Sequence, residues 1–228
     1  MPQPSLAILY EDNHLLAINK PAGLPTMGVT ADRDSLLAQA KQYIKVRYQK
    51  PGNVYLGAMS RLDAPVSGVV LLARTSKAAA RLTEQFKTRS VEKLYWTIVT
   101  GDVSPVAGRL VDFVRADERH RRMHRSAAGQ PGAQEARLSY RTVAALPAGT
   151  LLEIELETGR KHQIRLQLAS RGWHVLGDRK YGSTQPFAAG IALHSRRLTF
   201  VHPVRDEQIV LMAPLPPAWR KLGVRDRP

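Results

Sequence analysis

The sequence predicts an α+β fold built on a central, mainly antiparallel mixed β-sheet with flanking helices. Strand-like and helix-like segments follow one another irregularly, without the steady alternation of a doubly wound parallel sheet. The clearest strand covers residues 152–156, where leucine and isoleucine alternate with glutamate, as in a strand with one buried face. The 228 residues, 43% of them hydrophobic, are enough for one large or two small domains. We predict a single domain over residues 1–228.

The chain begins with two short strands and a helix. Strands are expected at residues 7–10 and 15–20, on either side of a polar turn. A helix is expected at residues 35–48, because apolar residues repeat there at helical spacing and Asp34 can act as the N-cap.

A strand, a helix and another strand follow. The apolar run Val69–Ala73 predicts a buried strand, and Thr75 or Ser76 is expected to cap the next helix. A further strand is expected at residues 94–100.

The C-terminal part continues the mixed pattern. After the strand at residues 152–156, a helix is expected at residues 161–171, with Gly172 at its C-terminal end. Residues 192–217 are expected to form short strands interrupted by prolines.

One segment differs in character from the rest. Residues 115–125 are densely basic, and a loop-like stretch follows them up to residue 132. No apolar periodicity runs through this segment, and its charges do not alternate in sign. We therefore predict a mobile basic loop insertion at about residues 115–137 rather than a linker between domains.

The net charge of the chain is +15, from 34 lysines and arginines against 19 aspartates and glutamates. This excess predicts a polyanionic partner, either a nucleic acid or an anionic membrane. The membrane is disfavoured, because no apolar run approaches the roughly 20 residues of a spanning helix and the N-terminus lacks a signal-peptide pattern. The absence of cysteine excludes disulfides, thiol nucleophiles and cysteine-bound zinc. We expect a cytoplasmic protein.

The strongest candidate for chemistry is the pair Arg61 and Asp63, on a loop before the Val69–Ala73 strand. A neighbouring guanidinium keeps a carboxylate ionised and oriented, and loops anchored on rigid strands often carry function. The alternative is a turn aspartate that accepts a local backbone hydrogen bond. The residues of this loop alone leave both interpretations open.

Several other kinds of site are disfavoured. The chain has neither a phosphate-binding P-loop nor a dinucleotide-binding fingerprint. His120 and His124 have the spacing of a metal pair, but they lie in an arginine-rich run that repels a cation. Ser67 lacks the nucleophile elbow of a hydrolase. We therefore expect no metal site and no hydrolase triad.

A second basic cluster lies at the start of the helix expected at residues 161–171. It contains Arg160, Lys161 and Arg165. Backbone N–H groups at a helix N-terminus and guanidinium groups both favour anions, so a phosphate-rich ligand fits this cluster. The alternative is a solubilising face of the helix.

The chain resembles the RluA-type pseudouridine synthases from about Leu9 to Pro216. The matching motifs, in chain order, are Asn19-Lys20-Pro21-x-Gly23, Arg61-Leu62-Asp63 with Ser67-Gly68, Lys93-Leu94-Tyr95, Thr158-Gly159-Arg160-x-His162-Gln163-Ile164-Arg165, Gly177-Asp178-x-x-Tyr181-Gly182, and Leu193-His194 with Leu198-x-Phe200-x-His202-Pro203. Each motif alone is weak, but together they follow the order of the family. Ser60 and Val66 stand where the family usually has His and Thr.

The resemblance implies a reaction and the roles of four residues. The family converts uridine in RNA to pseudouridine, without metal or cofactor, after the base has been flipped out of the RNA. Asp63 is then the aspartate that attacks the uridine, and Tyr95 stacks on the base and helps to remove a proton. Arg165 forms a salt bridge with this aspartate, and Arg61 enters the RNA stack where the uridine leaves.

The resemblance also implies a basic cleft across the sheet, a monomer, and a catalytic domain without the small S4 RNA-binding domain of many relatives. The residues expected to bind RNA, besides Arg61, are Arg160, Lys161, Arg119, Arg121, Arg122 and Arg125. Ile164, Leu198 and His162 are expected to line the base pocket or to be structural. The substrate that the resemblance implies is ribosomal or transfer RNA, and the sequence leaves the choice between them open.

Two other classes of protein compete with an isomerase. A non-catalytic RNA-binding protein on the same fold fits the charge, and the departures at Ser60 and Val66 keep this alternative open. A glycosidase needs two convergent carboxylates about 5–10 Å apart, and the matching motifs offer only Asp63. The isomerase is therefore the leading prediction.

Overall fold

The computed structural model of the chain describes residues 6–28, 34–120 and 122–226. The chain divides into two compact units. The first unit comprises the chain up to Val91 together with Ser195–Pro214, and the second comprises Glu92–His194 together with the chain from Leu215 onward. The polypeptide therefore passes from the first unit into the second, returns to the first, and ends in the second.

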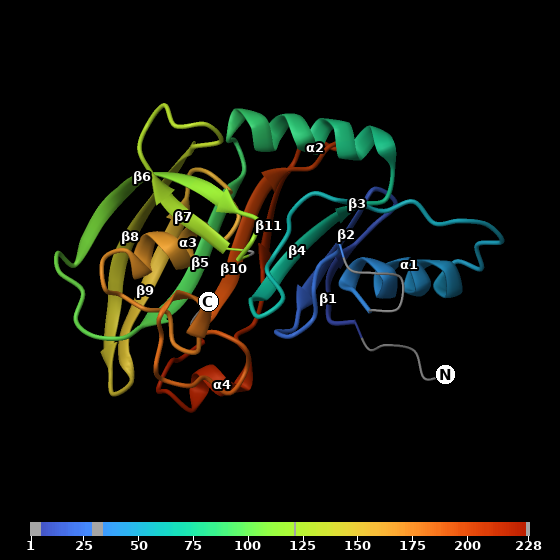
Figure 1. The fold of residues 1–228 in the computed structure, drawn as a ribbon. Coiled ribbons are helices and arrows are strands. Elements are labelled where there is room, and N and C mark those ends of the chain that lie inside the picture. Colours follow the sequence, from blue (N-terminus) through green and yellow to red (C-terminus); the bar gives the residue numbers. More distant parts are fainter. Residues whose placement is uncertain (1–5, 29–33, 121, 227–228) are drawn as a thin grey trace. The chain divides into compact units, whose positions relative to one another are not determined.

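The first unit is a sheet of mainly antiparallel strands with two helices. Its elements are β1 (Ile8–Glu11), β2 (Leu15–Lys20), α1 (Leu36–Arg47), β3 (Gly57–Ala58), β4 (Ser67–Ala73), α2 (Ser76–Thr88), most of β10 (Leu193–Val201) and β11 (Gln208–Met212) (Figure 1). The strands lie in the order β1-β2-β4-β10, with β3 beside β4 and β11 beside β10. The pairs β1–β2, β2–β4, β3–β4 and β10–β11 are antiparallel.

The core of the first unit forms around β4, which is buried along its whole length. Ala78 and Leu82 of α2 pack in one buried cluster with Val69 and Leu71 of β4. The apolar residues of α2 are four positions apart and so share one helix face. This packing makes β4 a rigid support for the loop that precedes it.

Both helices of the first unit begin at hydroxyl N-caps. The Thr75 hydroxyl accepts a hydrogen bond from the Ala78 N–H at 3.1 Å, which confirms one of the two predicted caps of α2. The prediction of Asp34 as the cap of α1 is wrong. Ser35 has an extended backbone directly before the helix, so its hydroxyl is the group that reaches the Ala38 N–H, at 3.2 Å.

The second unit is an antiparallel sheet with short helices. Its elements are β5 (Glu92–Val99), β6 (Ala107–Asp117), β7 (Arg122–Ser126), β8 (Gln134–Leu146), β9 (Gly149–Leu156), α3 (Gln163–Ala169), the 3-10 turn η1 (Arg179–Tyr181) and α4 (Pro217–Arg220). The strand order is β5-β9-β8-β6-β7, and each neighbouring pair is antiparallel. Helix α3 packs against β6 and β7.

The basic segment at residues 115–137 contains the end of β6, all of β7 and the start of β8, so the prediction of a loop there is wrong for these strands. β6 and β7 pair as an antiparallel hairpin, and β8 pairs with β6 on its other edge. Val114 and Met123 are buried and give the hairpin its apolar contacts. At the turn, the Asp117 carboxylate accepts a hydrogen bond from the His120 N–H at 3.0 Å. The buried apolar residues of the hairpin stand singly between basic ones. The sequence therefore shows no apolar periodicity from which the strands could be predicted.

The predicted class, a mainly antiparallel α+β sheet with flanking helices, is confirmed in both units. The helix predicted at residues 161–171 is shorter at both ends, because α3 runs from Gln163 to Ala169 and so ends before Gly172. The expectation of only short strands after residue 192 is wrong for β10, which has 9 residues. No helix in the described ranges is long and apolar enough to cross a membrane.

Candidate active site

The loop that carries Asp63 is held by hydrogen bonds from a neighbouring segment of the first unit. The Thr26 hydroxyl donates to the Leu62 carbonyl at 2.8 Å and accepts from the Leu62 N–H at 3.1 Å, and this contact is buried. The Gly23 N–H donates to the Ala64 carbonyl at 2.7 Å. The residues on either side of Asp63 are therefore fixed, while the Asp63 side chain is half-buried.

Lys20, the last residue of β2, is completely buried behind this loop. Its ammonium donates to three carbonyl oxygens, those of Pro21 at 2.8 Å, Leu24 at 2.7 Å and Ala64 at 3.1 Å. Burial lowers the pKa of Lys20 to about 8, while the charge of Asp63 acts in the opposite direction. A cation held by three acceptors thus lies within electrostatic reach of Asp63.

The sequence did not single out Lys20 as functional, although it belongs to the first matching motif. Lysine at the end of an apolar strand is normally exposed, so its burial could not be read from the pattern. The motif match at Asn19-Lys20-Pro21 was the available signal.

We predict that replacing Asp63 with Asn lowers the pKa of Lys20 below its value of about 8, because the carboxylate that supports the ammonium is lost. The unfolded chain keeps the ordinary lysine pKa of 10.5. Between these two pKa values the unfolded state binds the proton that the folded state has released, so this group makes folding more favourable as the pH rises. NMR titration of the lysine side chains measures the pKa of Lys20 in the wild-type protein and in the Asp63→Asn variant.

The Lys20→Met variant identifies the resonance of Lys20 in that titration. A Lys20 pKa near 10.5 in the wild-type protein would contradict the burial of its ammonium. A Lys20 pKa that stays the same in the Asp63→Asn variant would contradict the electrostatic contact between the two side chains.

Two residues next to the loop explain its entry into β4. Gly68 has φ +116°, and a Cβ atom there would lie 2.2 Å from the Ser195 carbonyl oxygen, so only glycine fits between β4 and β10. The Ser60 hydroxyl accepts a hydrogen bond from the Leu71 N–H at 2.9 Å. Ser60, which departs from the family pattern, therefore ties the start of the loop to β4. Arg61 is exposed beside it.

In the second unit, the segment before α3 is closed by the Gln163 side chain. Its amide oxygen accepts hydrogen bonds from the Thr158 hydroxyl at 2.8 Å and from the Arg160 N–H at 3.0 Å. Its amide nitrogen donates to the Arg137 carbonyl at 3.0 Å. His162 adopts a left-handed conformation with φ +53° to enter the helix. This turn fixes where the basic residues before the helix emerge.

The basic residues of this segment have different surroundings. Arg160 is half-buried, and its Nε donates to the Glu135 carbonyl at 3.0 Å. Lys161 is exposed. Arg165 is buried, and its guanidinium pairs with the Asp178 carboxylate in a bidentate contact, with Nε–Oδ2 at 2.6 Å and Nη2–Oδ1 at 2.8 Å.

Asp178 and Tyr181 were not predicted as parts of the site, although both lie in a matching motif. Asp178 is 1% exposed and is the buried counterion of Arg165 within the second unit. The Tyr181 ring lies 5.0 Å from the Arg165 guanidinium carbon. These two residues are 13 or more positions from Arg165 in the chain, so local patterns do not reveal the contacts.

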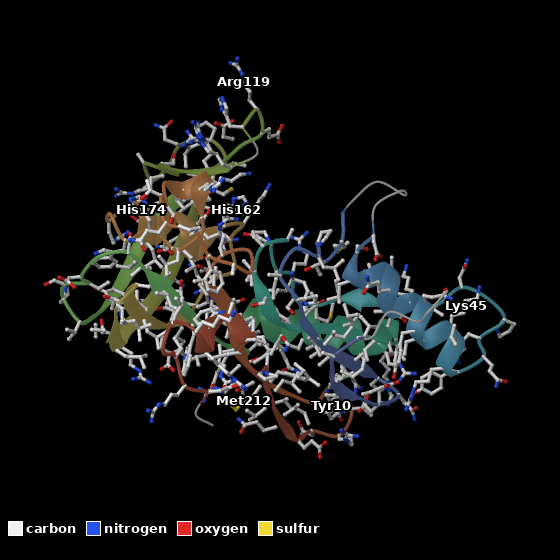
Figure 2. All side chains as sticks on the ribbon, turned by 90° about the horizontal axis from the view of Figure 1, so that it is seen from below. Tyr10, Lys45, Arg119, His162, His174 and Met212 are labelled. Carbon is white, nitrogen blue, oxygen red and sulfur yellow. The ribbon has the colours of Figure 1, made fainter. Side chains whose placement is uncertain are left out.

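The hairpin arginines lie on the outside of the second unit. Arg119, Arg122 and Arg125 are exposed, and Arg121 lies outside the described residues. Figure 2 shows Arg119 at the outer end of the hairpin, pointing away from the region of His162. Arg125 also lies 3.1 Å from the Asp112 carboxylate, which joins it to the base of the hairpin.

The remaining predicted residues divide between the units. Tyr95 is half-buried on β5, opposite Ile154 of β9. Ile164 is buried in α3, and the His162 ring contacts Tyr181. Leu198 belongs to the buried core of the first unit, which gives it a structural role.

The described part of the chain holds no group of three His, Asp or Glu side chains suited to a metal ion. His120 and His124 instead both contact the Asp117 carboxylate at 2.7 Å. The hydrogen bond from the His120 N–H, together with those from the two histidine side chains, lowers the pKa of Asp117 well below its usual range. The pair therefore serves the turn of the hairpin.

The chain is similar in sequence to known RNA pseudouridine synthases. The sequence model of a family described as RNA pseudouridylate synthase matches residues 14–170. Ribosomal large subunit pseudouridine synthase D of Xanthomonas campestris is 34% identical, over 95% of this chain and 68% of its own length. tRNA pseudouridine synthase C of Salmonella typhi is 33% identical, over 95% of this chain and 88% of its own length.

A solved structure agrees with these relatives. Human RNA Pseudouridylate Synthase Domain Containing 4 superposes with a TM-score of 0.77 at 27% sequence identity. The match covers 95% of this chain and 93% of the human chain. The likeness thus extends over both compact units.

Proposed function

The chain belongs to the RNA pseudouridylate synthase family, whose members are isomerases that act on RNA, and from this premise we propose that it converts uridine to pseudouridine in ribosomal or transfer RNA. The reaction breaks the N1–C1′ bond and forms a C5–C1′ bond. The proton on C5 is lost and N1 gains one, so no atoms are added overall. Such a rearrangement needs no redox partner.

Asp63 is the proposed catalytic carboxylate. It adds covalently to the base or the sugar, or it removes the C2′ proton, while the C1′ bond is exchanged. The observation that carries this assignment is the way its loop is held, through Thr26 on Leu62 and through Gly23 and Lys20 on Ala64. A nucleophile on a fixed loop is already oriented before the substrate arrives, which lowers the entropic part of the barrier.

Tyr95 and Arg165 are the proposed partners of Asp63. The Tyr95 ring stacks on the flipped base, and its hydroxyl helps to remove the proton from C5. Arg165 stabilises the ionised form of the Asp63 carboxylate. The bidentate contact with Asp178 supports this role, because it holds the Arg165 guanidinium in one orientation.

RNA binding is assigned to a basic cleft within a single catalytic domain. Arg61 fills the gap in the RNA stack after the uridine has left, which offsets part of the few kcal/mol that base flipping costs. The phosphates are bound by Arg160 and Lys161 and by the hairpin arginines, and the exposure of Arg61 and Lys161 supports this. We propose that the protein works as a monomer in the cytoplasm, where ribosomal and transfer RNA are found.

The function is tested by incubating the purified protein with total RNA from cells that lack its gene, followed by chemical mapping of pseudouridine. New pseudouridines in ribosomal or transfer RNA are expected with the wild-type protein. Their absence from every RNA class would overturn the proposal.

The hairpin arginines are expected to supply phosphate affinity. We predict that the triple variant Arg119→Ala, Arg122→Ala, Arg125→Ala reduces the slope of log affinity against log salt by about two to three, because each phosphate contact contributes about one. Filter binding of a substrate RNA over a range of salt measures the slope. The variant Lys45→Ala, Lys77→Ala, Lys87→Ala removes the same charge from exposed positions of α1 and α2. Equal slopes for the two triple variants would contradict the assignment to the hairpin.

A further inference from the structure

The Tyr181 hydroxyl lies where the basic hairpin meets the start of α3. It accepts a hydrogen bond from the Met123 N–H of β7 at 2.9 Å. It also bonds to Nδ1 of His162 at 2.8 Å. The ring of the same residue contacts the Arg165 guanidinium, at 5.0 Å from its carbon. One side chain therefore touches the hairpin, the N-cap of α3 and the buried arginine.

The backbone of Tyr181 is itself fixed from the opposite side. Nδ1 of His174 lies 2.7 Å from the Tyr181 carbonyl oxygen. The next residue, Gly182, has φ +92°, and a Cβ atom there would lie 2.8 Å from the His174 ring. Tyr181 is therefore placed by its own turn and does not depend on the hairpin for its position.

The hairpin is joined to α3 at two places. One is an apolar cluster, in which Val114 and Met123 of the hairpin pack with Leu166 of α3 and against Tyr181. The other is the buried Asp112 carboxylate of β6. Its bonding partners are the side chains of Gln167 at 2.9 Å, Arg171 at 3.0 Å and Arg125 at 3.1 Å. Arg165 lies on the same short helix as Leu166 and Gln167, which make these contacts from α3.

We propose that Tyr181 is a positioning residue that holds the basic hairpin in a fixed relation to Arg165. The hairpin then binds phosphates of the same RNA segment on which the catalytic arginine acts. The hydroxyl holds the hairpin through the Met123 N–H, and the ring supports the guanidinium. This inference rests on the proposed function, because it gives the hairpin the task of binding the substrate RNA.

Two substitutions distinguish the role of the Tyr181 hydroxyl from the role of its ring. Tyr181→Phe keeps the ring beside Arg165 and removes the hydroxyl, so KM for RNA is expected to rise by about 3- to 10-fold, and by more than kcat falls. Tyr181→Leu removes the ring as well, so kcat is expected to fall further than in Tyr181→Phe. Equal effects of the two substitutions on KM and kcat would overturn the separate roles.

A structural control comes from Tyr140, whose hydroxyl donates to the Pro105 carbonyl at 3.2 Å in the same unit. Tyr140→Phe also removes one tyrosine hydroxyl but does not touch the hairpin–α3 contact. It is expected to leave KM within about twofold of the wild type. A KM increase equal to that of Tyr181→Phe would show that the effect is general and would overturn the proposal.

Two further measurements test the link itself. Amide hydrogen exchange at Met123 is expected to speed up about 3- to 10-fold in Tyr181→Phe while core strands such as β4 keep their protection. In the background of the triple hairpin variant, Tyr181→Phe is expected to change KM by less than about twofold, because the hairpin no longer binds phosphates. Unchanged exchange at Met123, or a fully additive KM effect, would overturn the link.

The exchange measurement does not require catalysis. If the wild-type protein formed no pseudouridine, the proposed function would fail. The exchange at Met123 and the RNA affinity of the same variants would still decide whether Tyr181 holds the hairpin.

Discussion

Asp63→Asn is expected to lower pseudouridine formation by at least about 10³-fold while RNA affinity stays within about threefold of the wild type. The amide keeps the size of the side chain and cannot act as a carboxylate nucleophile or base. The backbone contacts of Leu62 and Ala64 that hold the loop do not involve the Asp63 side chain, so the loop is expected to keep its conformation. Single-turnover assays and filter binding on one RNA measure the two quantities.

The matched control is Asp102→Asn, at an exposed position of the second unit. It makes the same chemical change and is expected to leave both quantities at the wild-type level. Activity of Asp63→Asn close to that of the wild type would exclude Asp63 as the catalytic group. Such a result, together with full RNA affinity, would favour a non-catalytic RNA-binding protein on the same fold.

Asp178→Asn is expected to destabilise the protein by about 3 kcal/mol and to reduce activity strongly. Arg165 and Asp178 are 5% and 1% exposed, and the substitution removes the carboxylate charge from this buried bidentate pair. Removing one partner of a buried ion pair typically costs about 3–5 kcal/mol for this reason. Urea unfolding gives the change in free energy of unfolding, and the pseudouridine assay gives the change in activity.

The double variant Arg165→Met, Asp178→Leu separates stability from catalysis. It removes both charges, so it is expected to regain most of the lost stability but none of the activity. Glu84→Gln removes one partner of an exposed pair with Lys87, whose atoms are 3.8 Å apart, and is expected to cost less than about 1 kcal/mol. If Asp178→Asn were as mild as Glu84→Gln, the Arg165–Asp178 pair would not support the site.

Asp63→Asn and Asp178→Asn are expected to affect different properties of the protein. Asp63 lies on a loop whose backbone is held independently, so its loss affects mainly the chemistry and costs stability only through the lost support of the Lys20 ammonium. Asp178 neutralises a buried charge, so its loss affects folding and chemistry together. This difference can be measured directly, because Asp178→Asn is expected to shift the unfolding midpoint by far more than Asp63→Asn.

The elements with local signals could be predicted from the chain alone. The strand predicted at residues 15–20 is β2 with the same bounds, and Thr75 caps α2 as one of two expected residues. A helix cap and the apolar face of a strand depend on residues within a few positions of each other, so they can be read from the chain. The ordered motifs likewise identified the family, which the relatives confirm.

The contacts that hold the site together become visible only in the folded protein. The burial of Lys20, the pairing of Arg165 with Asp178 and the contact of Tyr181 with Met123 each join residues that are not neighbours in the chain. The hairpin was missed for a related reason, since Met123 is buried by packing on α3 and not by a periodic pattern of its own. A charged side chain reads as exposed until its buried partners are known, and those partners come from other elements of the fold.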